Sequence, residues 1–423
     1  MTRPRAFVVV TGSELVRGDR TDLNGPFLAR EVLALGLEPA RIAIVGDAPD
    51  ELEAPLREGL DADLCLVSGG LGPTHDDRTV ELLARAATAS LEVDAALEEQ
   101  IGEISRGFAE RMRRPYADFQ PGVTKQATLP VGAVSLGLAG TAPGFVLATA
   151  GGAAVVLPGP PAELQRLWPR ALETEPVRRV LERARPPEMR VLRLYGVSES
   201  AVARALEEAG GDGDGVEATI CARDFEIHVD LLADAGASER ADRLERALGE
   251  RLAPYLFSQD ERRVEELVLD ACRARRWSLV TAESCTGGMV ATRLTSVPGS
   301  SRSFVGGVVA YSNELKEREL DVPGELLAAH GAVSAEAAEA MAAGARARLG
   351  ADVAISITGI AGPEGGTPQS PVGLVYLHAS SPDAERARDF SIPGDRETIR
   401  RRATVMALHL LRGVLSQSRD ERM

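Results

Sequence analysis

Lysine is almost absent from this sequence. Of the 48 basic residues in the 423-residue chain, all but Lys125 and Lys316 are arginine. Such a skew is typical of a genome-wide codon bias, so a lysine that persists is a candidate for chemistry that arginine cannot perform. A guanidinium stays charged, whereas a buried lysine can lose its proton and act as a base. These two lysines are therefore the first candidate functional residues.

Three other absences exclude classes of protein. The 4 cysteines show no CxxC spacing, so neither a zinc site nor a disulfide framework is indicated. The net charge is −15 and no segment carries a basic excess, which argues against binding of nucleic acid. The N-terminus lacks a secretory pattern, and glycine and proline interrupt the uncharged stretch 126–162 too often for a membrane span. We therefore expect a cytoplasmic protein without a nucleic-acid or membrane partner.

The first part of the chain alternates short apolar segments with helical ones. Because the apolar segments are almost continuously hydrophobic, the alternation favours a parallel sheet with helices on both faces. The uncharged stretch adds further buried strands and turns. The predicted strands are 6–11, 41–45, 63–68 and 153–157, and the predicted helices are 24–35 and 50–60.

After about residue 175 the pattern changes twice. Residues 191–252 predict a small α+β module of the split β-α-β-β-α kind. From about residue 264 the α/β alternation returns and closes on an amphipathic helix at 396–415. We predict an α/β protein with two α/β domains and a small α+β module between them. The predicted domains are 1–172, 173–258 and 259–416, followed by a tail at 417–423.

The most specific motif lies in the third segment, at 282–288, where AESCTGG directly follows an apolar strand and precedes a helix. A nucleophile at such a turn lies beside free backbone N–H groups and the positive helix end, which suit a phosphate or an oxyanion. Gly287 and Gly288 let the backbone approach a ligand closely. A Ser/Thr helix cap followed by a glycine turn explains the same residues equally well.

Two further strand ends carry polar side chains. Tyr311, Asn313 and Lys316 follow one predicted strand, and Thr358 and Gly359 end another. In a parallel sheet such ends meet at one edge, so we expect them to lie near Ser284. A solvated surface position is the alternative for Lys316, as it is for most lysines.

The first segment has a constellation of its own. Gly69, Gly70 and Gly72 follow a buried strand in SGGLGPT, and glycine-rich turns of this kind cradle phosphates. Carboxylates stand close by in the sequence and could hold a divalent cation that activates water. These carboxylates belong to Glu14, Asp76 and Asp77. Helix capping is the alternative for Asp76 and Asp77.

These motifs carry a family resemblance over nearly the whole chain. AESCTGG, PGSS, YSNELK, TGIAGPEGG, PVG and GDRETIR resemble the C-terminal domain of the CinA family of competence/damage-inducible proteins. GSELVRGDRTDLN, SGGLGPTHDDRT, GTAPG and PGPP resemble the family's molybdopterin-binding-like N-terminal domain. One departure from the family pattern is Ser370, at a position where the resemblance implies a charged residue.

For the C-terminal domain the resemblance implies hydrolysis of nicotinamide mononucleotide (NMN) to nicotinate mononucleotide and ammonia, without a cofactor. Ser284 would be the nucleophile, Lys316 the general base and Tyr311 an assisting hydroxyl. Cys285 is a rival nucleophile, but no histidine accompanies it in a motif. The substrate would be held by Glu283, Thr286, Gly287, Gly288, Asn313, Thr358 and Gly359, with Arg396 or Arg400 on its phosphate.

For the N-terminal domain the resemblance implies hydrolysis of ADP-ribose with Co²⁺ or Mg²⁺ on Glu14, Asp76 and Asp77. Gly69, Gly70, Gly72, Thr74 and Lys125 would contact the nucleotide phosphates. A non-catalytic nucleotide- or molybdopterin-binding protein, linked to competence or DNA damage, is the alternative. The middle module resembles a KH fold, but its acidic charge and its lack of a GxxG loop argue against RNA binding. Base rates and the resemblance together predict a homodimer.

Overall fold

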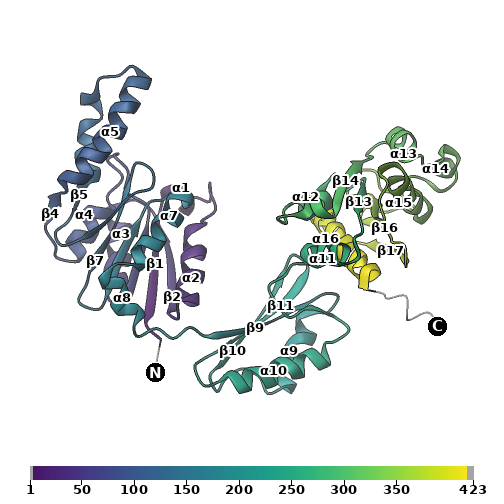
Figure 1. Cartoon of the computed structure of the whole chain (residues 1–423), viewed down its shortest axis with the longest axis horizontal. Coiled ribbons are helices and arrows are strands. Elements are labelled where there is room, and N and C mark those ends of the chain that lie inside the picture. Colours follow the sequence, from purple (N-terminus) through teal and green to yellow (C-terminus); the bar gives the residue numbers. More distant parts are fainter. Residues whose placement is uncertain (1–2, 417–423) are drawn as a thin grey trace. The chain divides into compact units, whose positions relative to one another are not determined.

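The chain folds into two compact units, one up to Glu188 together with Asp234–Gly236 and one comprising the rest (Figure 1). This computed structural model describes residues 3–416, so the predicted tail at 417–423 lies outside the described residues. The predicted fold class is confirmed. A small α+β module lies in the chain between a first α/β unit and a second α/β domain. Within residues 3–416 no helix is long and apolar enough to cross a membrane.

The first unit is built around a six-stranded sheet of order β2-β1-β3-β8-β7-β6. Strands β2, β1, β3 and β8 are parallel as predicted, and β7 and β6 extend the sheet in the antiparallel sense. The strands are β1 (Arg5–Thr11), β2 (Glu38–Val45), β3 (Leu64–Ser68), β6 (Val134–Leu138), β7 (Pro143–Ala148) and β8 (Ala153–Leu157), and β4 (Leu91–Val93) pairs with β5 (Thr128–Pro130).

Alternate residues of β1 enter two separate cores, which is why both faces of this sheet carry helices. Val8 and Val10 pack in the core that includes helices α2, α7 and α8, whereas Phe7 and Val9 pack in the core that includes α3 to α6. Helix α8 follows the predicted boundary at residue 172 and packs on β7 and β8. The helices are α1 (Ser13–Val16), α2 (Asn24–Ala34), α3 (Pro49–Leu60), α4 (Thr79–Ala86), α5 (Ala95–Met112), α6 (Gln120–Ala127), α7 (Pro161–Leu172) and α8 (Glu175–Leu181), with a 3-10 turn at Tyr116–Asp118.

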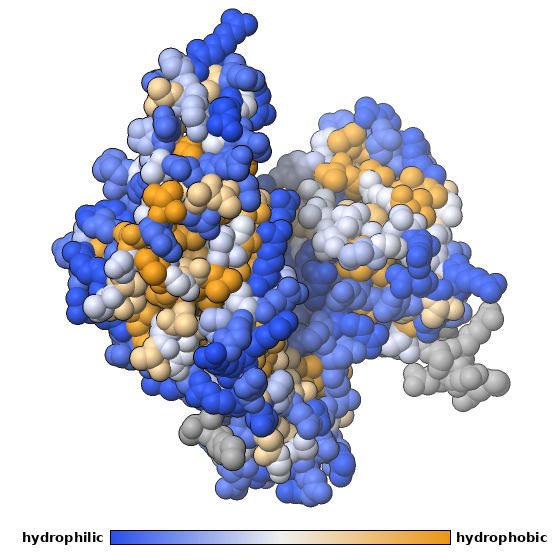
Figure 2. Space-filling model, turned by 60° about the vertical axis from the view of Figure 1, so that its left-hand side comes forward, coloured by the Kyte–Doolittle hydropathy of each residue, from blue (hydrophilic) through white to orange (hydrophobic). Residues whose placement is uncertain are grey.

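Apolar side chains are also exposed on the first unit. Leu91, Val93, Val131 and Val134 are each more than a third exposed. They come from β4, β6 and the turn after β5. Figure 2 shows apolar residues gathered on the face of this unit that is turned toward the viewer, whereas hydrophilic residues predominate on its rim.

The α+β module is a four-stranded sheet of order β10-β11-β9-β12, and two helices share its core. Strands β10 and β11 form an antiparallel hairpin, and β12 pairs antiparallel with β9. The order of the central elements matches the sequence prediction. The elements are β9 (Glu188–Leu194), α9 (Glu199–Glu208), β10 (Val216–Arg223), β11 (Glu226–Ala233), α10 (Ser238–Arg251) and β12 (Leu256–Ser258).

The last domain holds a five-stranded sheet of order β14-β13-β15-β16-β17. The first three strands are parallel, and β16 and β17 are antiparallel to their neighbours. Helices α11, α12 and α16 share a core with one face, and α13 to α15 share one with the other. The elements are α11 (Val264–Arg275), β13 (Leu279–Glu283), α12 (Met289–Thr295), a 3-10 turn (Ser300–Arg302), β14 (Phe304–Val309), α13 (Asn313–Leu320), α14 (Gly324–His330), α15 (Ala335–Leu349), β15 (Val353–Gly359), β16 (Leu374–Ser380), β17 (Glu385–Ser391) and α16 (Arg396–Ser416).

Candidate active site

A pocket lies at the carboxyl ends of the three parallel strands of the C-terminal domain. Strand β13 is paired with β14 on one side and β15 on the other, so the turns that follow all three strands meet at one edge. Of the predicted site residues, the pocket brings together Ser284, Tyr311, Asn313, Lys316, Thr358, Gly359 and Arg396.

Ser284 and Lys316 are in contact in this pocket. The Lys316 ammonium nitrogen Nζ donates to Ser284 Oγ at 3.2 Å and to the Ala310 carbonyl at 3.0 Å. Lys316 is only 2% exposed, so it is not the solvated surface residue that was the alternative, and Ser284 is 7% exposed. The Ser284 amide donates to the Ile357 carbonyl at 2.9 Å, which ties the nucleophile turn to β15.

Burial lowers the pKa of Lys316, and the neighbouring Cys285 thiol opposes that shift. The residue also lies in the first turn of α13, where Ser312 caps the helix by accepting from the Leu315 amide. The positive end of a helix disfavours an ammonium group, which acts in the same direction as burial. The neutral amine, which can accept a proton, is therefore a larger fraction of Lys316 than of a lysine in water.

Burial raises the pKa of the Cys285 thiol to about 11. Cys285 lines the same pocket and is 5% exposed. A thiol attacks as its thiolate, and a pKa this high leaves almost none of it at neutral pH. Within the pocket, Ser284 is therefore the better placed nucleophile.

Glu283 does not line the pocket, contrary to the prediction that it binds substrate. It is fully buried, and its carboxylate accepts from the Thr286 hydroxyl at 2.7 Å. It also accepts from the amides of Gly288, Val290 and Ala291 at 2.9 to 3.1 Å. A carboxylate with this many donors satisfies the otherwise unpaired amides at the start of α12. Glu283 therefore supports the nucleophile turn from the protein interior, and the Ser/Thr helix cap that was the alternative is not found, since the N-cap residue of α12 is Gly288.

Three other predicted substrate-binding residues also lie outside the pocket lining. Thr286 is fully buried, and its hydroxyl donates to Glu283. Gly287 and Gly288 adopt positive φ angles of 60° and 95°, which a residue with a side chain would adopt only with strain. These residues build the turn that presents Ser284.

The two arginines predicted for the substrate phosphate have different surroundings. Arg400 Nε donates to the Cys285 carbonyl at 3.0 Å and its Nη2 to the Thr286 carbonyl at 2.9 Å, so it braces the nucleophile turn instead of lining the pocket. Arg396 lines the pocket and donates to the Tyr311 hydroxyl at 2.7 Å and the Gly362 carbonyl at 2.8 Å. Of the two, Arg396 is the one placed to meet an anionic group.

Tyr311 and Thr358 make contacts that the sequence did not predict. Tyr311 is 57% exposed and its hydroxyl accepts from Arg396. The Thr358 hydroxyl donates to the Ala332 carbonyl at 2.6 Å, which fixes the loop before α15. Sequence reasoning also missed Glu364, Ala332 and Val333 in the pocket lining. The first lies in the quoted glycine-rich turn, whereas nothing in the sequence marks the two apolar residues.

A second crevice lies in the first unit, at the ends of its parallel strands. Its lining includes Glu14, Gly69, Gly70, Asp76 and Asp77. Gly72 lines it as well, and an adjoining pocket contains Lys125 beside Gly70, Gly72 and Asp77. The predicted glycine turn and carboxylates thus come together, although Thr74 faces its own loop.

Two carboxylates of this crevice, those of Asp76 and Asp77, contact Thr74 of their own loop. The Thr74 hydroxyl lies within hydrogen-bond distance of both Asp76 and Asp77, and the Thr74 amide donates to Asp77 at 3.0 Å. Lys125 Nζ donates to the Thr74 carbonyl. The hydrogen bond from the Thr74 hydroxyl lowers the pKa of Asp76. The helix-capping alternative is wrong for both aspartates, because the N-cap residue of α4 is Arg78 and makes no side-chain cap hydrogen bond, whereas Asp76 and Asp77 contact Thr74 of their own loop.

The predicted metal site on Glu14, Asp76 and Asp77 does not fit this arrangement. Within residues 3–416 no group of three or more His, Cys, Asp or Glu side chains is placed to hold a metal ion. A divalent cation such as Mg²⁺ needs several oxygen ligands at close to octahedral positions, and here the aspartates are turned toward Thr74. We therefore derive no chemistry through a metal in this crevice.

Two acidic residues of the crevice were not predicted. Asp47 follows β2 and accepts from the Thr11 hydroxyl at 2.7 Å and from the Ser13 amide and hydroxyl at 2.9 and 2.8 Å. Glu163 lines the crevice from the first turn of α7, and burial raises its pKa. The position of Asp47 after a strand end is the signal that could have found it.

Comparison with known proteins assigns all three parts of the chain. The model for the "probable molybdopterin binding domain" matches residues 7–176. The model for the "damage-inducible protein CinA KH domain" matches 189–258, and that for the "CinA C-terminal domain" matches 261–415. The chain is thus a three-part protein with a molybdopterin-binding-type domain, a KH domain and a CinA domain in that order.

Full-length relatives agree with this order. A CinA-like protein of Mycolicibacterium vanbaalenii is 44% identical over 419 residues, which cover 97% of this chain and 99% of the relative. A CinA-like protein of Mycobacterium tuberculosis is 42% identical over 424 residues, covering 97% of each chain. The chain belongs to the CinA family. A crystal structure of competence damage-inducible protein A from Klebsiella pneumoniae is 37% identical and covers 37% of this chain and 99% of that one, with a TM-score of 0.35.

Proposed function

We propose that the C-terminal domain is an amidohydrolase that converts NMN and water to nicotinate mononucleotide and ammonia. The observation that carries this proposal is the hydrogen bond of 3.2 Å between Lys316 Nζ and Ser284 Oγ, which belong to two buried residues of one pocket. The reaction type follows from that pair, because a serine with an adjacent base is the arrangement of nucleophilic acyl transfer. The choice of NMN rests on the family resemblance.

In the first half of the reaction, neutral Lys316 takes the proton of Ser284 as Oγ attacks the carboxamide carbon. The resulting oxyanion collapses, the C–N bond breaks, and Lys316 returns the proton to the departing nitrogen as ammonia leaves. In the second half, Lys316 takes a proton from water, whose oxygen attacks the Ser284 ester. The ester bond then breaks, nicotinate mononucleotide is released and Ser284 regains its proton.

Two features of the pocket fit an anionic nucleotide. Arg396 supplies a guanidinium at the mouth, where it already contacts the Tyr311 hydroxyl at 2.7 Å. A guanidinium binds a phosphate through two parallel hydrogen bonds. In the turn itself the amides of Ser284, Gly287 and Gly288 donate within the protein. The amide of Cys285, which lines the pocket, is the candidate donor to the oxyanion.

The proposal is tested by measuring ammonia release from NMN with purified wild type, Ser284→Ala and Cys285→Ala. We expect Ser284→Ala to lose activity and Cys285→Ala to retain most of it, because the protonated thiol takes no part in the chemistry. Cys285 is a matched control, since it neighbours Ser284 in the same turn and lines the same pocket. The reverse result would make Cys285 the nucleophile, and no turnover of NMN by wild type would remove the proposal.

For the first unit we propose binding of a nucleotide or pterin ligand at the glycine turn, with hydrolysis of ADP-ribose as the finer hypothesis. The supporting observation is the crevice at the ends of parallel strands, which is lined by Gly69, Gly70 and Gly72. Titration calorimetry with ADP-ribose, with and without Mg²⁺ or Co²⁺, followed by product analysis, separates binding from hydrolysis. If neither occurs with any of these metals, the nucleotide proposal is wrong.

A further inference from the structure

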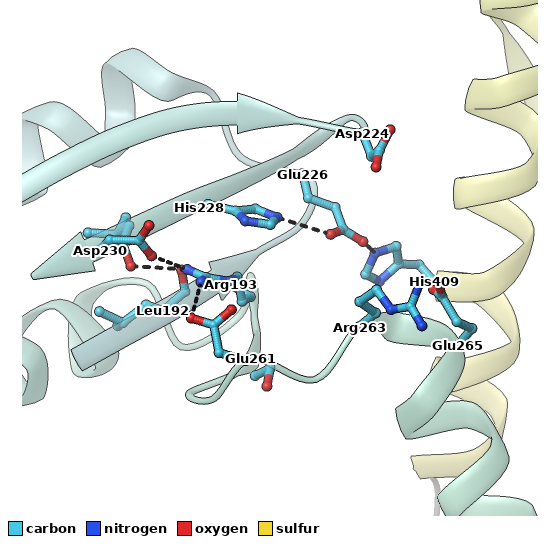
Figure 3. A network of polar contacts seen from close by, with 12 residues as sticks. Leu192, Arg193, Asp224, Glu226, His228, Asp230, Glu261, Arg263, Glu265 and His409 are labelled. Atoms are coloured by element: carbon cyan, nitrogen blue, oxygen red, sulfur yellow. Dashed lines mark hydrogen bonds and ion pairs between the residues drawn. The ribbon is translucent and has the colours of Figure 1, made fainter. Parts of the chain in front are cut away.

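The KH module contacts the catalytic domain through the tip of its β10–β11 hairpin (Figure 3). The tip residues Asp224 and Phe225 have positive φ angles of 49° and 64°. Arg223 pairs with Glu226, so these two residues form a two-residue hairpin turn, and such a turn requires positive φ at both of its central positions. The turn places the side chains of Asp224 and Phe225 at the end of the hairpin.

Those contacts are made with helix α16 of the catalytic domain. Asp224 accepts from Arg401 at 2.9 Å, and the Arg402 guanidinium lies 5.0 Å from the centre of the Phe225 ring. Glu226 accepts from His409 Nε2 at 2.7 Å. Three consecutive hairpin residues thus bind three positions along one helix.

The pair formed by Glu226 and His409 is the buried part of this contact. Glu226 is 6% exposed and His409 is 4% exposed. The His409 ring stacks on the Tyr195 ring, with the ring centres 3.7 Å apart, and packs edge-to-face against the Phe257 ring, with the ring centres 4.8 Å apart. Although burial opposes ionisation, hydrogen bonds from His228 and His409 lower the pKa of Glu226 to about 2. Glu226 is therefore an ionised acceptor, and removing it leaves a buried ring N–H without its partner.

Helix α16 also carries the residue that braces the nucleophile turn. Arg400 precedes Arg401 and donates to the carbonyls of Cys285 and Thr286. Because a peptide unit is planar and trans, fixing the Cys285 carbonyl also fixes the direction of the Thr286 N–H. The hairpin and the nucleophile turn are thus bound to adjacent residues of one rigid helix.

We propose that the KH module positions the nucleophile turn of the catalytic domain, and that Glu226 is the positioning residue, acting through His409, α16 and Arg400. This inference rests on the proposed amidase activity and assigns the KH module a part in it. Glu226 touches neither Ser284 nor the pocket. Its effect therefore falls on the geometry of the turn and not on the binding of the substrate.

The first test compares steady-state kinetics on NMN. We expect Glu226→Ala to lower kcat about tenfold, with KM nearly unchanged, a size that corresponds to a typical coupling through packed elements. Glu226→Gln restores most of kcat, since its amide oxygen can still accept from neutral His409. Asp230→Asn is the matched control on the same strand, because Asp230 pairs with Arg193 within the network and not with α16.

A double-mutant cycle with Arg400→Ala tests the route. If Glu226 acts through Arg400, Glu226→Ala causes no further loss of kcat in the Arg400→Ala background. Equal losses in both backgrounds, or a Glu226→Ala enzyme with wild-type kcat, would overturn the proposal. Should Glu226→Ala fail to fold, as judged by its thermal melt, His409→Phe keeps the stacking on Tyr195 and removes only the donor.

A readout without substrate separates this inference from the proposed activity. Hydrogen exchange followed by mass spectrometry is expected to be faster at residues 284–291 in Glu226→Ala and Arg400→Ala than in wild type or Asp230→Asn. Unchanged exchange at this turn overturns the positioning role. Faster exchange in a protein that does not hydrolyse NMN keeps the positioning role and rejects only the proposed substrate.

Discussion

The two crevices of the chain lie at the ends of parallel strands and share glycine-containing turns, yet their polar groups have different partners. In the C-terminal crevice Lys316 reaches the hydroxyl of Ser284 while almost excluded from solvent. In the N-terminal crevice Asp76 and Asp77 accept from Thr74 of their own loop. A glycine turn at a strand end therefore indicates a site, whereas the chemistry depends on which titratable group is buried against a nucleophile.

The largest expected effect sharpens this comparison, because Lys316 lies in the C-terminal crevice and Lys125 lies in the pocket that adjoins the N-terminal one. Lys316→Arg is predicted to lower kcat for NMN hydrolysis by at least about a hundredfold, since a guanidinium cannot accept a proton at working pH. Lys125→Arg is the matched control and is predicted to leave that rate unchanged. Steady-state assays of ammonia release measure both. Comparable rates for Lys316→Arg and wild type would exclude the general-base role.

The next effect is the pH dependence of the same reaction. The base must be neutral, so kcat/KM is predicted to rise about tenfold per pH unit below the pKa of Lys316 and to level off above it. Because burial lowers that pKa, the plateau should begin below the pKa of a lysine in water. A profile recorded from pH 5 to 10 measures this. A flat profile would break the link between the buried lysine and the chemistry.

A smaller effect concerns stability. The pKa of Lys316 is lower in the folded than in the unfolded chain, so folding releases a proton at pH values between the two. The unfolding free energy of wild type relative to Lys316→Met should therefore rise with pH and stop rising above about 10.4, where the unfolded lysine is neutral too. Urea unfolding at several pH values measures the difference. A difference that is independent of pH would mean that Lys316 is not desolvated.

The smallest expected effect is in the N-terminal crevice. Since its aspartates are bound to Thr74 and no group of three ligands is present within residues 3–416, millimolar Mg²⁺ or Co²⁺ alone is predicted not to raise the melting temperature. Differential scanning calorimetry of wild type and Asp77→Asn provides the measurement and its control. A metal-dependent increase that Asp77→Asn abolishes would restore the metal site predicted from the sequence.

The convergence of Ser284 and Lys316 could be predicted from the sequence because both follow apolar strands that adjoin in a parallel sheet. The roles of Glu283 and Arg400 could not be predicted, since the sequence around a charged residue looks the same whether its side chain faces a ligand or the protein. Strand β17 could not be predicted from the sequence, because it is an exposed, polar edge strand without an apolar run. Helix α5 was missed, although its Asp94 cap, which accepts from Leu97 at 3.0 Å, is an ordinary start signal.

Trapping of the acyl-enzyme tests the central claim most directly. Wild type is mixed with NMN, quenched in acid within the first turnovers and digested, and the peptide that contains residues 284 and 285 is analysed by tandem mass spectrometry. A nicotinate mononucleotide ester on Ser284, absent from Ser284→Ala, is the predicted result. An adduct on Cys285, or turnover of NMN by Ser284→Ala at the wild-type rate, would contradict it.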